Sequence, residues 1–521
     1  MMNEKKNNFP FYDWVPRPIG IIVLILMFIP PTFSGGAYLS NVSEMTGSLG
    51  VWTEDIQLAA FFTNIGMCLF PPFMVSFLQA RRTKQTYLWC FSLLVLLNLL
   101  CAITRSLPWL LLWCMLTGIV RSVAMINCTF TIAPYLTGIN TLNMFTATEE
   151  TTPEVQYKQE RMRTFLMPVL YGVILIIAQM SNVVVAWFAE HYTWQESYWV
   201  VAGMLLIAIL LIGILMKDEH RPFHYQVNKG MLVDMLLMML TLGSMTYFLV
   251  FGKTLDWFSS GRIIVCVGLF LMGVGCLLVR GIKGKYLPLS IFRYRNILIS
   301  SILFVAFMIF NSPSNFIGTF AKLSTQANNL HVAELSLYAI IGCLVGFVLS
   351  MWMVVRRWHF RWIFAVGLLL MGVSNAFMYF QYTTEGYLPY LQWAMMINFT
   401  GLMILYALVA AFGMKHLKAR YLVTFVFLMI CLRNAVGPVI GSCIYGNWMQ
   451  HKQQYYLTCL VQNVDRQHPA IGTQPTTTLY ARIVRQSAIS AMKDISGTTV
   501  WLILGTTLVV LILPYHKGET S

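Results

Sequence analysis

The sequence predicts an all-α membrane protein with 14 transmembrane helices. Hydrophobic residues make up 58% of the 521-residue chain and charged residues only 11%, against about 25% in an ordinary soluble domain. So few charges cannot cover a surface exposed to water, which excludes a soluble globular enzyme and a disordered chain. The 11 cysteines show no framework spacing, which excludes a small disulfide-stabilised scaffold. The apolar stretches lack the alternation of a β-barrel.

A helix that crosses a bilayer needs roughly 20 predominantly apolar residues. Fourteen stretches of the chain meet this requirement, and the N-terminal MMNEKKNN leads into the first of them without a small-residue cleavage site. We therefore expect no removable signal peptide. The predicted spans are 18–39, 55–78, 87–104, 108–134, 164–189, 197–216, 230–251, 263–280, 297–320, 335–355, 362–381, 390–413, 421–446 and 498–514.

The basic residues predict the orientation of these spans. With the N-terminus in the cytoplasm, 24 of the 35 Lys and Arg residues fall on the cytoplasmic side and nine outside, which leaves Arg121 and Arg433 within spans. Cytoplasmic loops of membrane proteins carry such an excess of Lys and Arg. The asymmetry therefore predicts that both termini are cytoplasmic. It also accounts for the net charge of +15, so the excess of basic residues does not indicate nucleic-acid binding.

Two short basic loops suggest an internal repeat. The loop after the second span reads ARRTKQ and the loop after the tenth reads VRRWHFR, so each follows the second helix of a six-helix set. This pattern predicts a 6+2+6 arrangement: an N-terminal bundle (1–216), two inserted linker helices (217–296) and a C-terminal bundle (297–521). The long external loop 447–497 can form a helical hairpin that caps the outer mouth, meets a partner protein or gates the exit. A solvated connector is the alternative.

The sequence offers no catalytic or cofactor-binding constellation. All nine His residues fall in loops or at span ends, whereas a membrane haem needs axial ligands inside the bilayer. There is no C-x-x-C pair, no zinc spacing, no phosphate-binding P-loop and no nucleophile paired with a base. We therefore expect no enzyme, no metal and no cofactor, which leaves transport driven by a gradient or a non-catalytic membrane role.

Polar residues within the spans are the candidate substrate-binding groups. A charge at mid-span costs about 2.5–3.5 kcal/mol on insertion scales, so the two arginines are expected to face a cavity, a substrate or a gating partner. A structural tie between helices is the alternative. The amides are individually more typical of interhelical hydrogen bonds, but together they suggest a polar seam. The candidates are Arg121, Asn127, Asn64, Gln179, Asn311, Arg433 and Asn434.

The carboxylates stay away from the middle of every span. Glu44 and Asp55 lie at the outer side of the first two spans. They are the best candidates for proton coupling, which normally uses an alternately exposed carboxylate or histidine. Two buried arginines without a buried acid favour an anionic, zwitterionic or neutral amphiphile as substrate. The 32 Met and 34 Phe residues are suited to a cavity for bulky apolar ligands.

Glycines and prolines mark expected bends and close contacts. Gly342 and Gly346, and the GPVIG run from Gly437 to Gly441, allow close helix approach or bending. The pairs Pro30-Pro31 and Pro71-Pro72 are expected to kink the first two spans.

Four stretches of the second half have the character of family motifs. Asp234 begins a span that runs to FGKTLDWFSSGRI, YLPLSIFRYRNI lies at 286–297, RNAVGPVIG lies at 433–441, and a long loop ends RIVRQSAISAMKD. These stretches resemble the EmrB/QacA-type drug:proton antiporters of the major facilitator superfamily, in which the second corresponds to the entry to the C-terminal half and the third to the span 13 motif. The likeness covers nearly the whole chain and is strongest in the second half.

The first half departs from this family pattern. The position of the Asp in the family's first span corresponds to about Gly36 in this sequence. The loop after the second span keeps the basic residues Arg81 and Lys84 but lacks the family's Asp. The span 4 motif becomes CMLTG, with Arg121 one turn later, and the span 5 motif associated with antiport becomes SNVVVA (181–186).

The resemblance implies a major facilitator fold and proton-coupled, multidrug-like efflux of amphipathic compounds by alternating access. The expected location is a bacterial cytoplasmic (inner) membrane, and partners of such pumps can include a periplasmic adaptor and an outer-membrane channel. The expected gating residues are Arg81, Lys84, Gly437, Pro438 and Gly441. The alternatives are a specific exporter of an anionic lipid or metabolite and a non-transporting sensor or scaffold.

Overall fold

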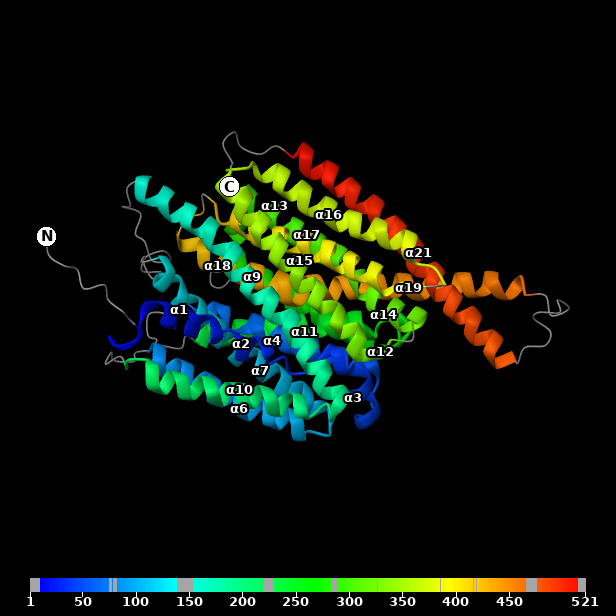
Figure 1. Ribbon diagram of the computed structural model, residues 1–521, viewed down its shortest axis with the longest axis horizontal. Helices are drawn as coiled ribbons and strands as arrows, with labels where there is room; N and C mark the ends of the chain where they lie inside the picture. Colours follow the sequence, from blue (N-terminus) through cyan, green and yellow to red (C-terminus); the bar gives the residue numbers. More distant parts are fainter. Residues whose placement is uncertain are drawn as a thin grey trace. The chain divides into compact units, whose positions relative to one another are not determined.

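The computed structural model describes residues 10–74, 77, 82–137, 153–218, 229–282, 289–325, 327–384, 386–415, 417, 419–464 and 476–513. Its regular structure is almost entirely helical (Figure 1). The chain forms two compact units. Unit 1 is Met1–Phe304 with Ala410–Val436, and unit 2 is Val305–Val409 with Gly437–Ser521. The 6+2+6 division of the chain stays a prediction.

Unit 1 holds most of the helices of the first half of the chain and one segment from the second half. It contains α1 (Arg17–Leu26), α2 (Ile29–Phe33), η1 (Leu39–Asn41), α3 (Val42–Leu49), α4 (Thr53–Leu69), η2 (Pro71–Phe73), α6 (Thr83–Ile103), α7 (Leu107–Thr137), α9 (Pro153–His191), α10 (Glu196–Leu215), α11 (Lys229–Phe251), η3 (Trp257–Ser259), α12 (Gly261–Ile282), η4 (Leu289–Arg293), α18 (Ala419–Cys431) and the π-helical turn η5 (Leu432–Val436). Helices α13 (Arg295–Asn311) and α17 (Leu388–Gly413) run through both units. Unit 2 contains α14 (Ser314–Thr325), α15 (Asn329–Val355), α16 (Phe360–Gln381), α19 (Gly437–Gln462) and α21 (Thr476–Ile512).

Twelve helices of the described chain are long and apolar enough to cross a membrane. They coincide with the third to fourteenth predicted spans. The first two predicted spans, 18–39 and 55–78, contain shorter helices instead. The structure therefore has twelve membrane-length helices among its described residues, and the total of fourteen spans stays a prediction.

Proline pairs interrupt these two shorter spans. Helix α1 ends at Leu26, and the five-residue α2 carries Pro30 and Pro31 near its start. Helix α4 ends at Leu69, and the next two prolines open the 3-10 turn η2. Proline lacks the backbone N–H that continues a helix, and its ring clashes with the preceding turn. The two predicted kinks are confirmed and are full breaks in the helices.

Helices α4 and α7 of unit 1 pack at very short range. A Cβ atom on Gly118 would lie 2.0 Å from the Thr63 carbonyl oxygen, and one on Gly66 would lie 2.2 Å from the Met115 carbonyl oxygen. Only glycine allows the two backbones to approach so closely, as in other small-residue helix contacts in membranes. Helix α6 packs against both α7 and α10, and Tyr87 on α6 is fully buried in the core between them.

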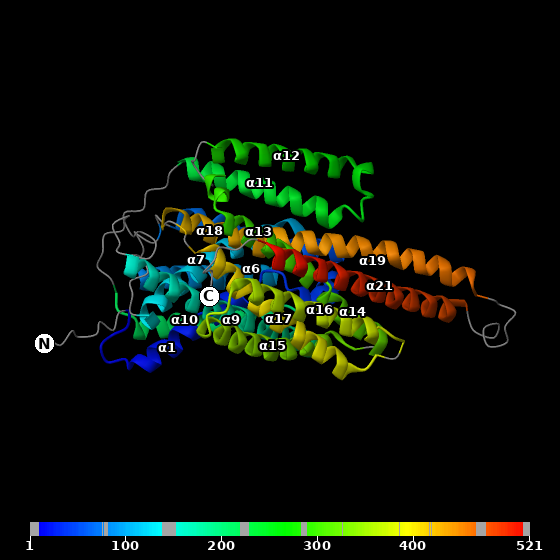
Figure 2. The same cartoon turned by 90° about the horizontal axis from the view of Figure 1, so that it is seen from above.

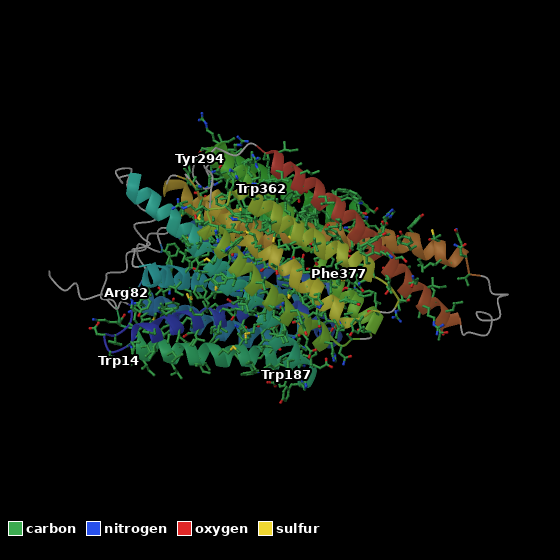
Figure 3. The ribbon with its side chains drawn as sticks, turned by 45° about the horizontal axis from the view of Figure 1, so that its top comes forward. Trp14, Arg82, Trp187, Tyr294, Trp362 and Phe377 are labelled. Atoms are coloured by element: carbon green, nitrogen blue, oxygen red, sulfur yellow. The ribbon has the colours of Figure 1, made fainter. Side chains whose placement is uncertain are left out.

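Exposed tryptophans mark the two ends of unit 1. Figure 3 shows Trp14 near one end, together with Arg82, and Trp187 near the other. The side chains of Trp14 and Trp187 are 63% and 42% exposed. Tryptophan is enriched where a membrane protein meets the lipid headgroups, so these positions fit the two edges of a bilayer.

Unit 2 is organised around α16, α19 and α21. Helix α21 packs along α16 and against α19 (Figure 1), and the core beside them contains Phe320, Met378 and Met492. Helix α15 approaches α17 through Gly342 and Gly346, where an added Cβ would lie 2.3 Å and 2.7 Å from carbonyl oxygens of α17. The close approach expected at these two glycines is confirmed.

The predicted external loop 447–497 is helical over most of its described length. Helix α19 continues to Gln462 and α21 begins at Thr476, and the pair extends past the end of α16 (Figures 1 and 2). An ion pair of 2.7 Å joins Lys452 Nζ to Asp494 Oδ2 across the hairpin. A helical hairpin is therefore present, whereas its proposed roles as a cap, a gate or a partner surface stay predictions.

The two helices of the predicted linker, α11 and α12, form a pair within unit 1 (Figure 2). The Asp234 carboxylate on α11 is 1% exposed and makes an ion pair with Nε of Arg280 on α12. Arg280 also donates from Nη2 to the Gly230 carbonyl oxygen at 3.1 Å. Helix α11 in turn packs on α4 and touches η5. The pair is thus an integral part of the unit rather than a loose connector.

We predict that Asp234→Asn lowers the thermal midpoint of the purified protein by several degrees, because it leaves a guanidinium without its counter-charge. The charge reversal Asp234→Arg together with Arg280→Asp should recover part of the loss. The measurement is thermal unfolding in detergent. Equal midpoints for the wild type and the single variant would contradict the assigned role of the pair.

Candidate functional site

A cavity of about 170 Å³ lies within unit 1, between α4, α7, α9, the end of α17, α18 and η5. A single water needs only about 10–15 Å³ by a comparable measure, so the space accommodates an organic molecule. Six methionines contribute to its wall: Met67, Met74, Met125, Met167, Met414 and Met429. Methionine is flexible and polarizable, and surfaces rich in it adapt to apolar ligands of different shapes.

Arg433 is the one charged residue in the described wall of the cavity. It lies in η5, a π-helical turn directly before Gly437 and Pro438. Proline at 438 cannot donate a hydrogen bond back to the preceding turn, which favours such a local change of helical pitch. Single π-helical turns are frequent at functional sites, where they reorient a side chain.

Two neighbours hold the guanidinium of Arg433 in place. Its Nε donates to Asn434 Oδ1 at 3.0 Å, and its Cζ lies 5.6 Å from the ring centroid of Tyr171 on α9. A guanidinium at that distance from an aromatic face is attracted by the ring quadrupole, a cation–π interaction. Both neighbours are neutral side chains, so they orient the guanidinium without neutralising its positive charge.

Arg121 lies next to this site. It is half-buried on α7, its Nε is buried without a hydrogen-bond partner, and its charge is repelled by that of Arg433. Its neighbour Ser122 lines the cavity, whereas Arg121 itself does not. Within the described part of the chain, the recorded ion pairs involve neither arginine. The substrate-binding role of both residues stays a prediction.

The predicted amides of unit 1 differ in their surroundings. Asn127 is fully buried and donates from Nδ2 to the Thr83 carbonyl oxygen at 3.4 Å, which ties α7 to α6. Gln179 Oε1 accepts from Asn182 on the same helix at 3.5 Å. Asn64 is half-buried on α4. None of these three lies in the cavity wall. The contact of Asn127 is a tie between helices, whereas that of Gln179 lies within α9.

Two further amides complete the predicted set. Asn434 holds Arg433 and is therefore the amide closest to the cavity's charge. Asn311 belongs to unit 2, where its Oδ1 accepts from Asn398 Nδ2 at 2.9 Å and joins α13 to α17. The predicted polar seam is thus a set of separate contacts in the described residues, and a substrate contact by any amide stays a prediction.

The predicted proton-coupling carboxylates sit at helix starts. Asp55 Oδ2 accepts from the Trp52 backbone N–H at 3.0 Å and caps the first turn of α4, a stabilising arrangement at the positive end of a helix. Glu44 lies in the first turn of α3. Neither belongs to the wall of the cavity, and their part in proton uptake stays a prediction.

The predicted gating residues fall into three places. Arg81 lies outside the described residues. Lys84 Nζ donates to the Gly213 carbonyl oxygen at 3.0 Å near the end of α10, where a cation is favoured by the helix dipole. Gly437 and Pro438 begin α19. Gly441 faces the end of α13, where an added Cβ would lie 3.3 Å from the Ile309 Cα and 2.1 Å from Oγ of Ser312, the residue that follows the helix.

Sequence reasoning missed the methionines of the cavity and Tyr171. A signal existed, since Ser122, Met125, Ile126 and Thr129 recur at the spacing of one face of α7. A face of this composition looks the same whether it meets lipid, another helix or a cavity. Only the arrangement of several helices distinguishes the three.

We predict that Gly441→Ala destabilises unit 2 by about 1–3 kcal/mol, the usual cost of overpacking, because the new methyl group clashes with the Ser312 hydroxyl and lies only 3.3 Å from the Ile309 Cα of α13. Gly446→Ala on the same helix is the matched control, since the space around it is open. Its expected effect is neutral or a gain of up to about 1 kcal/mol from helix propensity. Thermal unfolding compares the two, and equal midpoints would argue against a close α13–α19 contact.

No family model and no curated protein matches the sequence. Solved structures do match along nearly the whole chain. A variant of the peptide transporter POT has a TM-score of 0.56 at 14% identity and covers 97% of both chains. Tetrameric PepTSo2 has a TM-score of 0.55 at 13% identity and covers 95% of this chain and 98% of its own. The nucleoside transporter NupG has a TM-score of 0.53 at 12% identity and covers 94% and 98%.

These similarities show the fold. The chain is a multi-pass membrane protein with the fold of the major facilitator superfamily, and the names of the matched structures describe transporters rather than enzymes. The expectation of an all-α membrane protein with this fold is thus confirmed, and the expectation that the chain is not an enzyme stays a prediction. The narrower likeness to EmrB/QacA-type antiporters stays a prediction.

Proposed function

We propose that this protein is a secondary active transporter that moves amphipathic compounds across a membrane by alternating access. The observation that carries the proposal is the cavity of unit 1, with its methionine wall and Arg433, in a chain of this fold. A polar anchor within an apolar, adaptable wall suits ligands that have both characters. In transporters built from helix bundles, rocking of the bundles exposes such a site to one side of the membrane at a time.

We further propose that transport is outward and coupled to protons, as in multidrug efflux across a bacterial cytoplasmic membrane. The support is the motif resemblance in the second half of the chain and the position of Asp55 and Glu44 outside the cavity, where a proton could be exchanged without contact with the substrate. A periplasmic adaptor and an outer-membrane channel belong to the same proposal. The absence of an acid from the described cavity wall favours the alternative of a specific exporter of an anionic lipid or metabolite.

The first test is transport itself. Purified protein is reconstituted in proteoliposomes with a pH-sensitive dye inside, and a panel of anionic, zwitterionic, neutral and cationic amphiphiles is added. We expect proton movement that depends on substrate and disappears with an uncoupler. Silence across the whole panel would overturn the proposal and favour a sensor or scaffold.

The second test places the substrate in the cavity. We expect Met429→Ala to raise KM roughly three- to tenfold for the transported amphiphile, because apolar burial worth about 0.7–1.4 kcal/mol is lost. Met272→Ala on α12 is the matched control, since this methionine is 56% exposed and lies outside the cavity wall. Equal KM values for the two variants would place the substrate elsewhere.

A further inference from the structure

We infer that the cavity of unit 1 binds an anionic amphiphile, with its charged head on Arg433 and its apolar body along the methionine wall. This inference rests on the proposed function, because it names the substrate class of the same site. The shared chemistry is a carboxylate, sulfonate or phosphate group joined to an apolar body. Such a molecule can be a single-chain lipid or a water-soluble organic anion.

The charge of the site is the first argument. Arg433 faces a wall that carries no acid among its described residues, and the charge of Arg121 adds to its positive potential. An isolated charge in an apolar setting is unfavourable unless it is paired. A bound anion supplies the counter-charge that the described wall lacks, whereas a cation would be repelled.

The orientation of the guanidinium is the second argument. Asn434 accepts from Nε, and Tyr171 contributes its ring face and a hydrogen bond of its hydroxyl, so the remaining N–H donors of the terminal Nη groups are the part that meets a ligand. Arginine binds carboxylates and phosphates through pairs of parallel N–H donors. Because the side chain is already held by protein neighbours, little ordering remains to be done when the anion arrives.

The distribution of polar and apolar groups is the third argument. Leu422 and Arg433 both line the cavity and are eleven residues apart, about 16 Å along a helix. Ser122, beside Arg121, and Tyr171 belong to the Arg433 end. At the opposite end, Met74, Ile126 and Phe130 form one apolar cluster, and the hydroxyl of the adjacent Thr129 is satisfied by the Met125 carbonyl oxygen at 2.9 Å. The site therefore has a positive end and a long apolar end, the complement of an anionic amphiphile.

Binding of matched probes tests the inference. Full-length protein in phosphatidylcholine nanodiscs is titrated with decanoate, decyltrimethylammonium and decanol, which share a chain length and differ in the charge of the head. We expect decanoate to bind at least about tenfold more tightly than the cation, a difference of about 1.4 kcal/mol. Tighter binding of the cation would overturn the assignment.

Variants identify the anchor. We expect Arg433→Gln to weaken decanoate binding about tenfold or more and to leave decanol binding unchanged, while Arg433→Lys retains part of the affinity. The decanol titration and the lysine variant report whether the protein is folded. Arg262→Gln, at an exposed position of α12 outside the cavity wall, is the matched control. Unchanged decanoate affinity in Arg433→Gln would overturn the inference.

Two further ligands separate the sources of the anion. Oleate represents a lipid and naphthalene-2-sulfonate a soluble organic anion, and binding of either one through Arg433 supports the inference. Failure of both would overturn it. The proposed function fails independently: anion binding without any transport would remove the transporter assignment alone, and transport of cations only would remove the anion assignment alone.

Discussion

The hydrocarbon core of a membrane offers no hydrogen-bond partner to the polypeptide backbone, and the structure depends on this constraint. Most of the chain satisfies it with long unbroken helices. In unit 1 the regular helices are interrupted after Phe33, after Leu69 and at Leu432–Val436. Neighbouring side chains replace some of the lost helical bonds: Tyr198 donates its hydroxyl to the Gly36 carbonyl oxygen at 2.5 Å, and Tyr38 donates to that of Phe33 at 2.7 Å.

These breaks also position the candidate site. Met74 follows the proline-induced turn η2, and Arg433 lies in the π-helical turn η5; both line the cavity. The surrounding helices are fixed by contacts that allow little adjustment, such as Gly66 and Gly118 between α4 and α7. Helix α11, held to α12 by its ion pair, packs on α4 and η5. A rigid frame of this kind lets an irregular segment present a charge at a defined place.

Much of the fold could be predicted from the sequence, because a membrane-spanning helix has a strong compositional signal. The third to fourteenth spans were identified in this way, and the prolines located the breaks in the first two. The site was less accessible. Arg433 could be identified because a charged residue within a span is rare. The residues around it gave no such signal. For an amide within a span, such as Asn127, the sequence does not distinguish a substrate ligand from a hydrogen bond to a neighbouring helix. Asp55 stood out as an acid, although its visible contact is a helix cap formed with Trp52. Such distinctions depend on which helices meet, and composition does not specify that.

The distribution of charge constrains how binding in the cavity can respond to pH. Asp234 is the buried acid on the described helices, and it is already paired with Arg280 outside the cavity wall. The described wall of the cavity contains no histidine and no carboxylate, the side chains that most often change charge between pH 5 and 8 in proteins. Any dependence of substrate binding on pH in that range must therefore come from protonation of the substrate itself or from groups outside the cavity. Under the proposed function, coupling to protons through this chain thus requires a titratable group outside the described wall of the cavity.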